Sequence, residues 1–231
     1  MSSTKSEALF ISLCNSLSLT VEKIPESQTK TPDFRVTTTG GVFLAEVKDL
    51  RPNEEEKRLL REFREKRPVC VVSELGRRAR GMIENAKRQL REFKGQCLPG
   101  VIVLYDNIKL DDGTSLGPRM ALSPDHINAA MFGQWVVDLQ IEKGTGKIVV
   151  RNDRCGPNES FTRYTKNYVS AVAVICDYFG PLTITLYHNP YADYPLPLNA
   201  FCGPNCYNFR VSNENAKKPQ SWIRCDHEAS A

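Results

Sequence analysis

Apolar side chains recur every three or four residues in two segments of the chain, as they do on one face of an amphipathic helix. In residues 5–17 these positions are Ala8, Leu9, Ile11, Leu13 and Leu17. In residues 73–94 they are Leu75, Ala79, Met82, Ile83, Ala86, Leu90 and Phe93. We therefore predict a short helix with Glu7 near its start and a longer helix that Ser73 caps.

Short apolar runs bounded by turn residues predict strands. In the first half of the chain they occupy residues 19–24, 33–36, 42–48 and 101–105. The Gly40-Gly41 pair between the second and third runs indicates a hairpin turn. The run at 101–105 follows the longer predicted helix, so we expect it to be a buried strand beside an earlier strand.

Weaker patterns fill the remainder of the chain. Residues 53–67 suggest an exposed, highly charged helix, and Ser123-Pro124 has the cap-and-proline pattern that begins another. Further strands are expected at residues 135–141, 147–151, 169–175 and 182–187, of which the first two form a hairpin. Residues 168–178 also fit a helix, and the tail from Asn189 shows no periodicity. The succession of elements predicts an α/β fold with a central mixed sheet flanked by helices, extra C-terminal strands and a loop-rich tail.

The composition is that of an ordinary globular protein, with 41% hydrophobic and 25% charged residues in 231. This length favours one domain over residues 1–231. No run approaches the roughly 18 consecutive apolar residues of a membrane span. The first residues lack the apolar stretch of a secretory signal, and eight cysteines are expected as free thiols, so we predict a cytoplasmic protein.

Positive charge is concentrated in one segment. Residues 57–94 contain 13 Lys and Arg against 5 Glu, a net charge of +8, whereas the whole chain carries +4. Such asymmetry suits a polyanionic partner, because neutralised phosphates release condensed counterions. The candidate nucleic-acid contacts on the longer helix are Arg77, Arg80, Lys87 and Arg91. A solvated helix surface is the alternative.

The most specific chemical pattern joins Pro32-Asp33 to Glu46-Val47-Lys48 across the predicted hairpin. Side chains alternate along a strand, so Glu46 and Lys48 project from one face, and the hairpin returns Asp33 to their neighbourhood. Two adjacent carboxylates repel one another unless a cation lies between them, and oxygen ligands suit Mg²⁺ or Mn²⁺. The backbone carbonyl of Val47 is a further candidate ligand, and the Lys48 ammonium a candidate for stabilising the transition state of phosphodiester hydrolysis.

This arrangement resembles the PD-(D/E)XK nuclease superfamily over about residues 5–106, with residues 107–231 as an extension. The resemblance implies a restriction-endonuclease-like core and a Mg²⁺-dependent nuclease, with Asp33, Glu46 and Lys48 as catalytic residues. Glu7 occupies the place of the acidic residue that often joins the site from the first helix. Gln89 matches a glutamine that several such families carry on the helix after the lysine. DNA is the expected substrate, more so than RNA, and a homodimer is expected by the same resemblance.

Other hypotheses remain beside the nuclease. One is a non-catalytic nucleic-acid-binding or protein-interaction module that keeps the fold. Another places Glu46 and Lys48 on the solvated face of an edge strand, with Asp33 capping a turn. A third is a structural zinc at Cys202, Cys206, Cys225 and His227, although the tight Cys-x-His spacing favours free cysteines. His188 is expected to end a strand rather than to carry protons.

Overall fold

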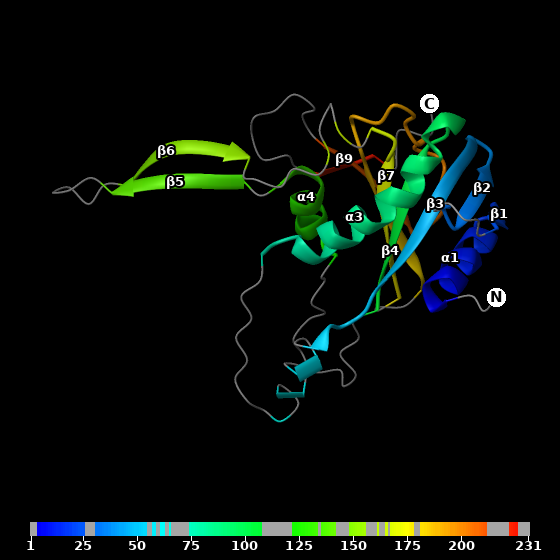
Figure 1. Cartoon of the computed structure of the whole chain (residues 1–231), viewed down its shortest axis with the longest axis horizontal. Coiled ribbons are helices and arrows are strands. Elements are labelled where there is room, and N and C mark those ends of the chain that lie inside the picture. Colours follow the sequence, from blue (N-terminus) through cyan, green and yellow to red (C-terminus); the bar gives the residue numbers. More distant parts are fainter. Residues whose placement is uncertain are drawn as a thin grey trace.

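An eight-stranded mixed β-sheet forms the centre of the computed structural model, and helices pack on both of its faces (Figure 1). The structure describes residues 4–25, 31–54, 57–58, 61–62, 65, 74–107, 122–133, 135–141, 148–155, 161, 165, 167–177, 181–211 and 222–225. The strands of this sheet are β1 Thr20–Lys23, β2 Phe34–Thr38, β3 Gly41–Leu50, β4 Gly100–Asp106, β7 Ala171–Cys176, β8 Thr183–His188, β9 Cys206–Val211 and β10 Trp222–Arg224. The described helices are α1 Lys5–Ser16, α3 Arg77–Glu92 and α4 Pro124–Phe132, with a 3-10 turn at Lys94–Gln96.

The strand order is β1-β2-β3-β4-β7-β8-β9-β10. β1, β2 and β3 form an antiparallel meander, whereas β3, β4 and β7 are parallel neighbours. Parallel neighbours need a crossover, and α3 supplies the one between β3 and β4. β3 therefore lies inside the sheet, with β2 on one side and β4 on the other, which excludes the edge-strand hypothesis for Glu46 and Lys48.

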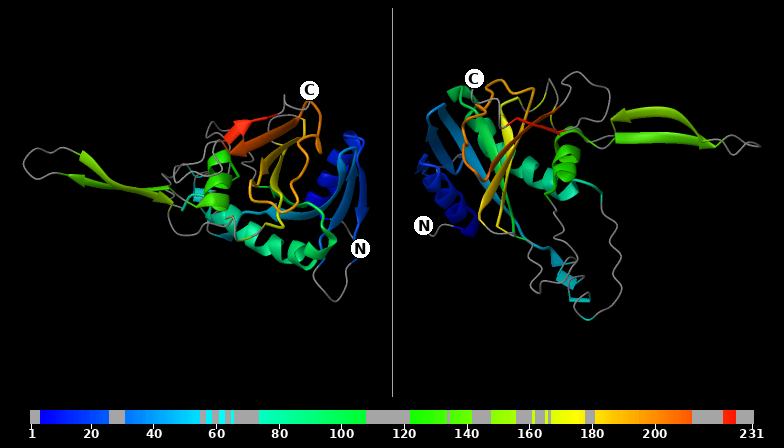
Figure 2. Two further views of the ribbon diagram at one scale, coloured as in Figure 1. Left: turned by 90° about the horizontal axis from the view of Figure 1, so that it is seen from above. Right: turned by 180° about the vertical axis from the view of Figure 1, so that it is seen from behind.

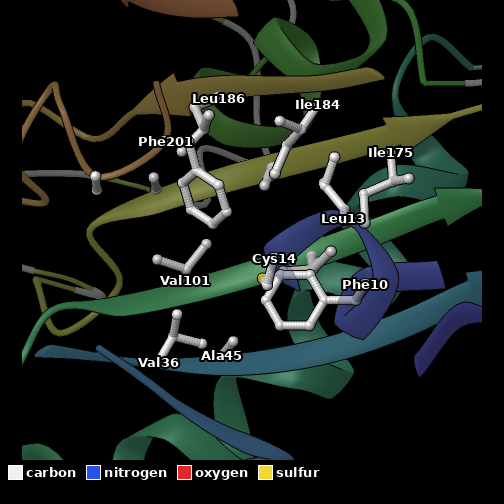
Figure 3. Packing of buried hydrophobic residues seen from close by; sticks show 14 of the residues in the cluster. Phe10, Leu13, Cys14, Val36, Ala45, Val101, Ile175, Ile184, Leu186 and Phe201 are labelled. Atoms are coloured by element: carbon white, nitrogen blue, oxygen red, sulfur yellow. The ribbon is translucent and has the colours of Figure 1, made fainter. Parts of the chain in front are cut away.

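The sheet separates two hydrophobic clusters. On one face, Phe10, Leu13 and Cys14 of α1 pack against alternate residues of the strands, as Figure 3 shows. The rings of Phe10 and Phe34 lie 5.6 Å apart. On the other face, α3 and α4 cover Leu44, Leu50, Ile102 and Leu104. Neighbouring residues of β3 and β4 thus point into opposite clusters, which is why β4 is almost uniformly apolar and why β3 is apolar from Val42 to Ala45.

The two periodic segments are helices, as predicted. α1 begins with a capping box in which the Thr4 side chain accepts from the Glu7 backbone and the Glu7 carboxylate accepts from the Thr4 backbone. α3 begins later than expected, after Gly76, and the predicted cap Ser73 lies outside the described residues. A Cβ at Gly76 would lie 2.6 Å from the His126 carbonyl oxygen, so glycine permits the close approach of α4 at this point.

The second half is partly as predicted. α4 begins after Ser123, whose side chain accepts from the backbone of His126. β7 and β8 confirm two predicted strands, and the helical alternative for residues 168–178 is wrong. β5 Trp135–Ile141 and β6 Ile148–Cys155 confirm the second hairpin, which projects away from the main sheet in both views of Figure 2.

The tail is more regular than its sequence suggested. β9 pairs in parallel with β8, and β10 pairs with β9, so part of the expected loop region completes the sheet. Of the charged helix expected over residues 53–67, only scattered positions lie within the described residues, and residues 54, 57–58 and 61–62 are helical. Within the described ranges, no helix is both long and apolar enough to cross a membrane.

Candidate active site

Strand register brings Asp33, Glu46 and Lys48 together. Phe34 pairs with Ala45 across β2 and β3, so Asp33, one residue earlier, lies beside Glu46. The Asp33 carboxylate accepts the backbone N–H of Val47 at 2.8 Å. Glu46 and Lys48 lie two residues apart in β3 and therefore on one face, where their side chains form an ion pair.

The Glu46 carboxylate is fully buried, with 0% of its side chain exposed. One of its oxygens, Oε1, accepts from the Lys48 ammonium, whose side chain is 28% exposed. The other oxygen, Oε2, makes no hydrogen bond to a described residue, although the Asp33 backbone N–H lies near enough to lower the pKa of the carboxyl group. An orphaned buried carboxylate oxygen is costly, and such atoms in native proteins call for a ligand or a functional explanation.

Burial dominates the electrostatics of both carboxylates. It raises the pKa of Glu46 to about 7, with a further contribution from the Asp33 carboxylate, and these effects outweigh the opposing influence of Lys48. Burial likewise raises the pKa of Asp33, although the Val47 N–H and Lys48 act to lower it. Burial thus disfavours the ionised form of both carboxyl groups, and further positive charge at this place would favour it.

Glu7 approaches the same place from the first turn of α1. Its carboxylate accepts from the Lys23 ammonium at 3.1 Å, and it is close enough to Asp33 to raise the pKa of that carboxyl group. The side chain of Glu7 is 12% exposed. The expected participation of an acidic residue from the first helix is therefore geometrically reasonable, with Lys23 as its immediate partner.

The two carboxylates are ligands of the kind that a divalent cation such as Mg²⁺ takes from proteins. No group of three His, Cys, Asp or Glu side chains in the described part of the chain is close enough to hold a metal. Mg²⁺, however, usually retains several waters and takes only one or two carboxylates from the protein. Asp33 and Glu46 supply two carboxylates, and the Oε2 atom of Glu46 is a buried acceptor with no described donor.

Gln89 lies on α3 and is partly buried. Within the described residues, no hydrogen bond links Gln89 to Asp33, Glu46 or Lys48. The supporting role predicted for Gln89 therefore stays a prediction. The apolar side of α3, formed by Ala79, Ile83, Ala86 and Leu90, is the side that faces the sheet.

The four cations predicted to contact nucleic acid differ in availability. Arg77 is exposed at the start of α3. Arg80 is only 14% exposed and donates to Glu74 at 2.7 Å and to the Ala129 carbonyl at 3.1 Å, so it joins α3 to α4. Lys87 pairs with Glu84, and Arg91 lies 3.9 Å from the Glu92 carboxylate. Local acidic residues thus offset much of the predicted basic surface.

The C-terminal cysteines occupy different environments. Cys202 is exposed, whereas Cys206 and Cys225 are buried, and Cys225 donates to the Asn208 carbonyl. His227 lies outside the described residues, so the four-ligand zinc hypothesis stays a prediction. His188 ends β8, as expected, and its ring hydrogen-bonds to the Asn208 side chain at 3.0 Å within the core.

Lys23 and Arg51 near the site escaped sequence reasoning. Lys23 meets Glu7 only because β1 and α1 lie side by side, and residues 16 positions apart have no periodic relation. Arg51 follows β3 directly and donates to Asp49 at 2.7 Å. Asp49 and Arg51 are out of step with the alternation that places Glu46 and Lys48 on one face, so that count gave no signal for them.

The raised pKa of Glu46 predicts how the free energy of unfolding of the metal-free protein depends on pH. Its folded pKa of about 7 exceeds the ordinary 4.5, so the unfolded chain ionises first as pH rises. The free energy of unfolding should fall between about pH 4.5 and 7, by at most about 3 kcal/mol at ~1.4 kcal/mol per pKa unit. Urea unfolding in EDTA should show this fall in the wild type and a much flatter profile in Glu46→Gln. Parallel profiles for the two proteins would contradict the assignment.

Comparisons of the chain with protein-family models, with curated proteins and with solved structures found no match. The geometry of Asp33, Glu46 and Lys48 and the motif resemblance are therefore the basis for inferring a function.

Proposed function

We propose that the protein is a metal-dependent nuclease of the PD-(D/E)XK type that hydrolyses phosphodiester bonds of DNA. One observation carries the proposal: the fully buried carboxylate of Glu46, with an orphaned oxygen among the described residues, lies beside Asp33 and is paired to Lys48. A structural ion pair needs one carboxylate and one ammonium. A second carboxylate at the same place adds repulsion, which a bound cation relieves while both carboxyl groups stay ionised.

Asp33 and Glu46 would hold Mg²⁺ or Mn²⁺, with the backbone carbonyl of Val47 as a third candidate ligand. When bound, the cation polarises the scissile phosphate and lowers the pKa of water. The Val47 N–H donates to Asp33 and so fixes the direction of that carboxylate. Glu46 is fixed by burial and by Lys48, which limits the reorganisation that ligand binding requires.

The Lys48 ammonium stabilises the negative charge that develops in the transition state of hydrolysis. Its ammonium is partly exposed while bonded to Glu46 Oε1, so it faces both the carboxylate and the solvent side where a substrate enters. From there it donates to the attacking water and to the phosphate oxygens as negative charge grows on them. Glu7, held by Lys23, assists Asp33 from α1 by orienting solvent on that side of the site.

The order of elements supports the finer fold assignment. A helix, a strand, the motif hairpin, a crossover helix and a parallel strand follow one another over about residues 5–106, as in a restriction-endonuclease-like core. We extend the proposal to a homodimer, which would pair two such sites on a duplex. We extend the proposal also to a cytoplasmic location, in which the cysteines are kept reduced.

A non-catalytic binding module with this fold is the second candidate. Glu84 and Glu92 lie beside Lys87 and Arg91 on α3, and this compensation of charges favours the protein-interaction form of such a module over the nucleic-acid-binding form. Such a module has no need of the buried carboxylate pair, and hydrolysis separates the two candidates.

The test is incubation of the purified protein with supercoiled plasmid, linear duplex, single-stranded DNA and RNA, each with Mg²⁺, Mn²⁺ or EDTA. We expect cleavage of DNA with either metal and none with EDTA. Cleavage that persists in EDTA would exclude the proposed chemistry. Salt-sensitive DNA binding without cleavage in any condition would establish the non-catalytic module instead.

A further inference from the structure

Arg35 of β2 lies on the same face of the sheet as the candidate site. Phe34, the residue before it, is buried in the cluster that α1 covers, so Arg35 and Asp33 both point to the opposite face. Arg35 follows Asp33 by two residues, a rise of about 6.8 Å along the strand. It pairs with Leu44 across β2 and β3, which makes Glu46 its diagonal neighbour at about 7–8 Å. The backbone of Arg35 is thus next to both carboxylate residues.

A neutral group holds the Arg35 guanidinium. Its Nη2 atom donates to Gln96 Oε1 at 3.0 Å, at the end of the 3-10 turn that follows α3. Glu22 lies opposite Arg35 on β1, but its carboxylate is exposed and forms no ion pair with the guanidinium within the described residues. Arg35 is also not among the groups that shift the pKa of Asp33 or Glu46, so it is not the counterion of either carboxylate.

The guanidinium has the geometry to bind phosphate where it stands. Arginine carries five N–H donors in a planar fork, and the contact with Gln96 uses one of them. The others can donate in pairs to the oxygens of a phosphate. The side chain of Arg35 is half-buried, so a ligand on this face can reach it from solvent.

α3 leaves the face of β1 and β2 that carries Arg35 uncovered. The buried side of α3 packs on Leu44 and Leu50 of β3 and on β4. In Figure 1, α3 crosses the middle of the sheet, whereas β1 and β2 lie at one edge. Glu22 and Thr37, which share the face of Arg35, are exposed. A polymer can therefore lie on β2 beside α3 and continue to the two carboxylates.

We propose that Arg35 binds a phosphate adjacent to the scissile one and so positions the DNA strand over Asp33 and Glu46. This inference rests on the proposed function for its ligand class. Arg35 is a positioning residue, since it holds the backbone of the substrate while Lys48 acts on the reacting phosphate. Glu22 shares the same face and repels the backbone, so its removal is expected to have the opposite effect on binding.

The test is fluorescence anisotropy with a short labelled DNA duplex in EDTA, where binding is measured without hydrolysis. Arg35→Gln is expected to weaken binding about 3- to 10-fold at roughly 0.1 M salt and to lower the slope of log affinity against log salt by about 1, because one phosphate is no longer neutralised. Glu22→Gln should strengthen binding. Gln96→Ala keeps the Arg35 charge and should retain the slope.

Steady-state cleavage with Mg²⁺ gives a second measurement. A contact with an adjacent phosphate is the same in the ground state and in the transition state, so Arg35→Gln should raise KM and change kcat little. A contact that served only to join β2 to the end of α3 would instead lower the melting temperature and leave the salt slope unchanged.

Arg88→Gln is the matched control, because it removes an equal charge from an exposed position of α3. It should leave affinity, salt slope and KM close to those of the wild type. An unchanged salt slope in Arg35→Gln, an equal loss in Arg88→Gln, or no DNA binding by the wild type would overturn the inference. So would a loss of binding in Arg35→Gln that Gln96→Ala reproduces together with a lower melting temperature.

The two proposals fail in different ways. If the wild type cleaves with Mg²⁺ but Arg35→Gln keeps its affinity and KM, the nuclease stands and the role of Arg35 is wrong. If DNA binding depends on Arg35 but no condition gives cleavage, Arg35 stands as a phosphate contact and the hydrolytic function is wrong.

Discussion

Replacing Lys48 by alanine is expected to slow DNA cleavage about 100- to 1,000-fold at saturating Mg²⁺, the usual effect of losing one donor to a developing oxyanion. The ammonium is the cation bonded to Glu46 Oε1 and is not itself a metal ligand. Its loss therefore removes stabilisation of the transition state and leaves both carboxylates in place. The measurement is the single-turnover rate of cleavage of a labelled duplex.

The fold should survive this change. Without Lys48, Glu46 is left buried with no ammonium, but its pKa of about 7 already allows a proton to neutralise it. Metal binding by the variant is best measured near pH 8, where the carboxyl group is ionised more fully. Arg210→Ala, which removes an exposed cation from β9, is the matched control and should cleave normally. A Lys48→Ala protein that retains wild-type rates would remove Lys48 from the mechanism.

Glu46→Gln is expected to abolish the stabilisation that divalent cations give the folded protein. A ligand that binds only the folded state stabilises it by about 2.7 kcal/mol at a concentration 100 times its Kd. Near pH 8 the wild type should therefore melt at a higher temperature with Mn²⁺ than with EDTA, and the variant should melt at the same temperature in both.

The metal-free wild type and the metal-free Glu46→Gln variant should also differ in stability. Glutamine has the shape of glutamate without its charge, so the variant avoids the unfavourable burial of a carboxylate beside Asp33. It should be more stable than the wild type near pH 8 in EDTA. Glu92→Gln, at a half-exposed position of α3, is the control and should retain the response to Mn²⁺. A full Mn²⁺ response in Glu46→Gln would place the cation elsewhere.

The part of the fold that sequence predicted well is the part with local signals. The spacing of apolar residues predicted both α1 and α3, although the buried face of α1 is formed by Phe10, Leu13 and Cys14 and shares only Leu13 with the predicted positions. The β2–β3 hairpin follows from two apolar runs and the glycines between them. The start of α3 was placed too early because its limit is set by a tertiary contact. Gly76 adopts a positive φ of 74° where α4 packs against it.

Pairing between distant strands was the least accessible feature. β9 joins the sheet through parallel pairing with β8, which local alternation does not encode, and its segment Cys206–Val211 follows a loop rich in proline and asparagine. Predicting the tail as loops missed this contribution. The partner residues of β9 become apparent only when the whole sheet is assembled.

In the candidate site, too, some features follow from local sequence signals and others only from tertiary packing. Alternation along β3 was sufficient to place Glu46 and Lys48 on one face, and the hairpin was sufficient to bring Asp33 beside them. Burial of Glu46 was not predictable, because it depends on β4 and on the cluster that α3 and α4 complete. The salt bridge from Lys23 to Glu7 and the contact from Arg78 to Arg51 likewise arise from the packing of separate elements.

Cleavage of supercoiled plasmid by the wild type and by Lys48→Ala, prepared identically and assayed with Mg²⁺ and with EDTA, tests the central claim most directly. The proposed site predicts nicked or linear products only from the wild type and only with Mg²⁺, while both proteins unfold cooperatively in a thermal melt. Equal cleavage by the two proteins, or no cleavage by either, would contradict hydrolysis at Asp33, Glu46 and Lys48.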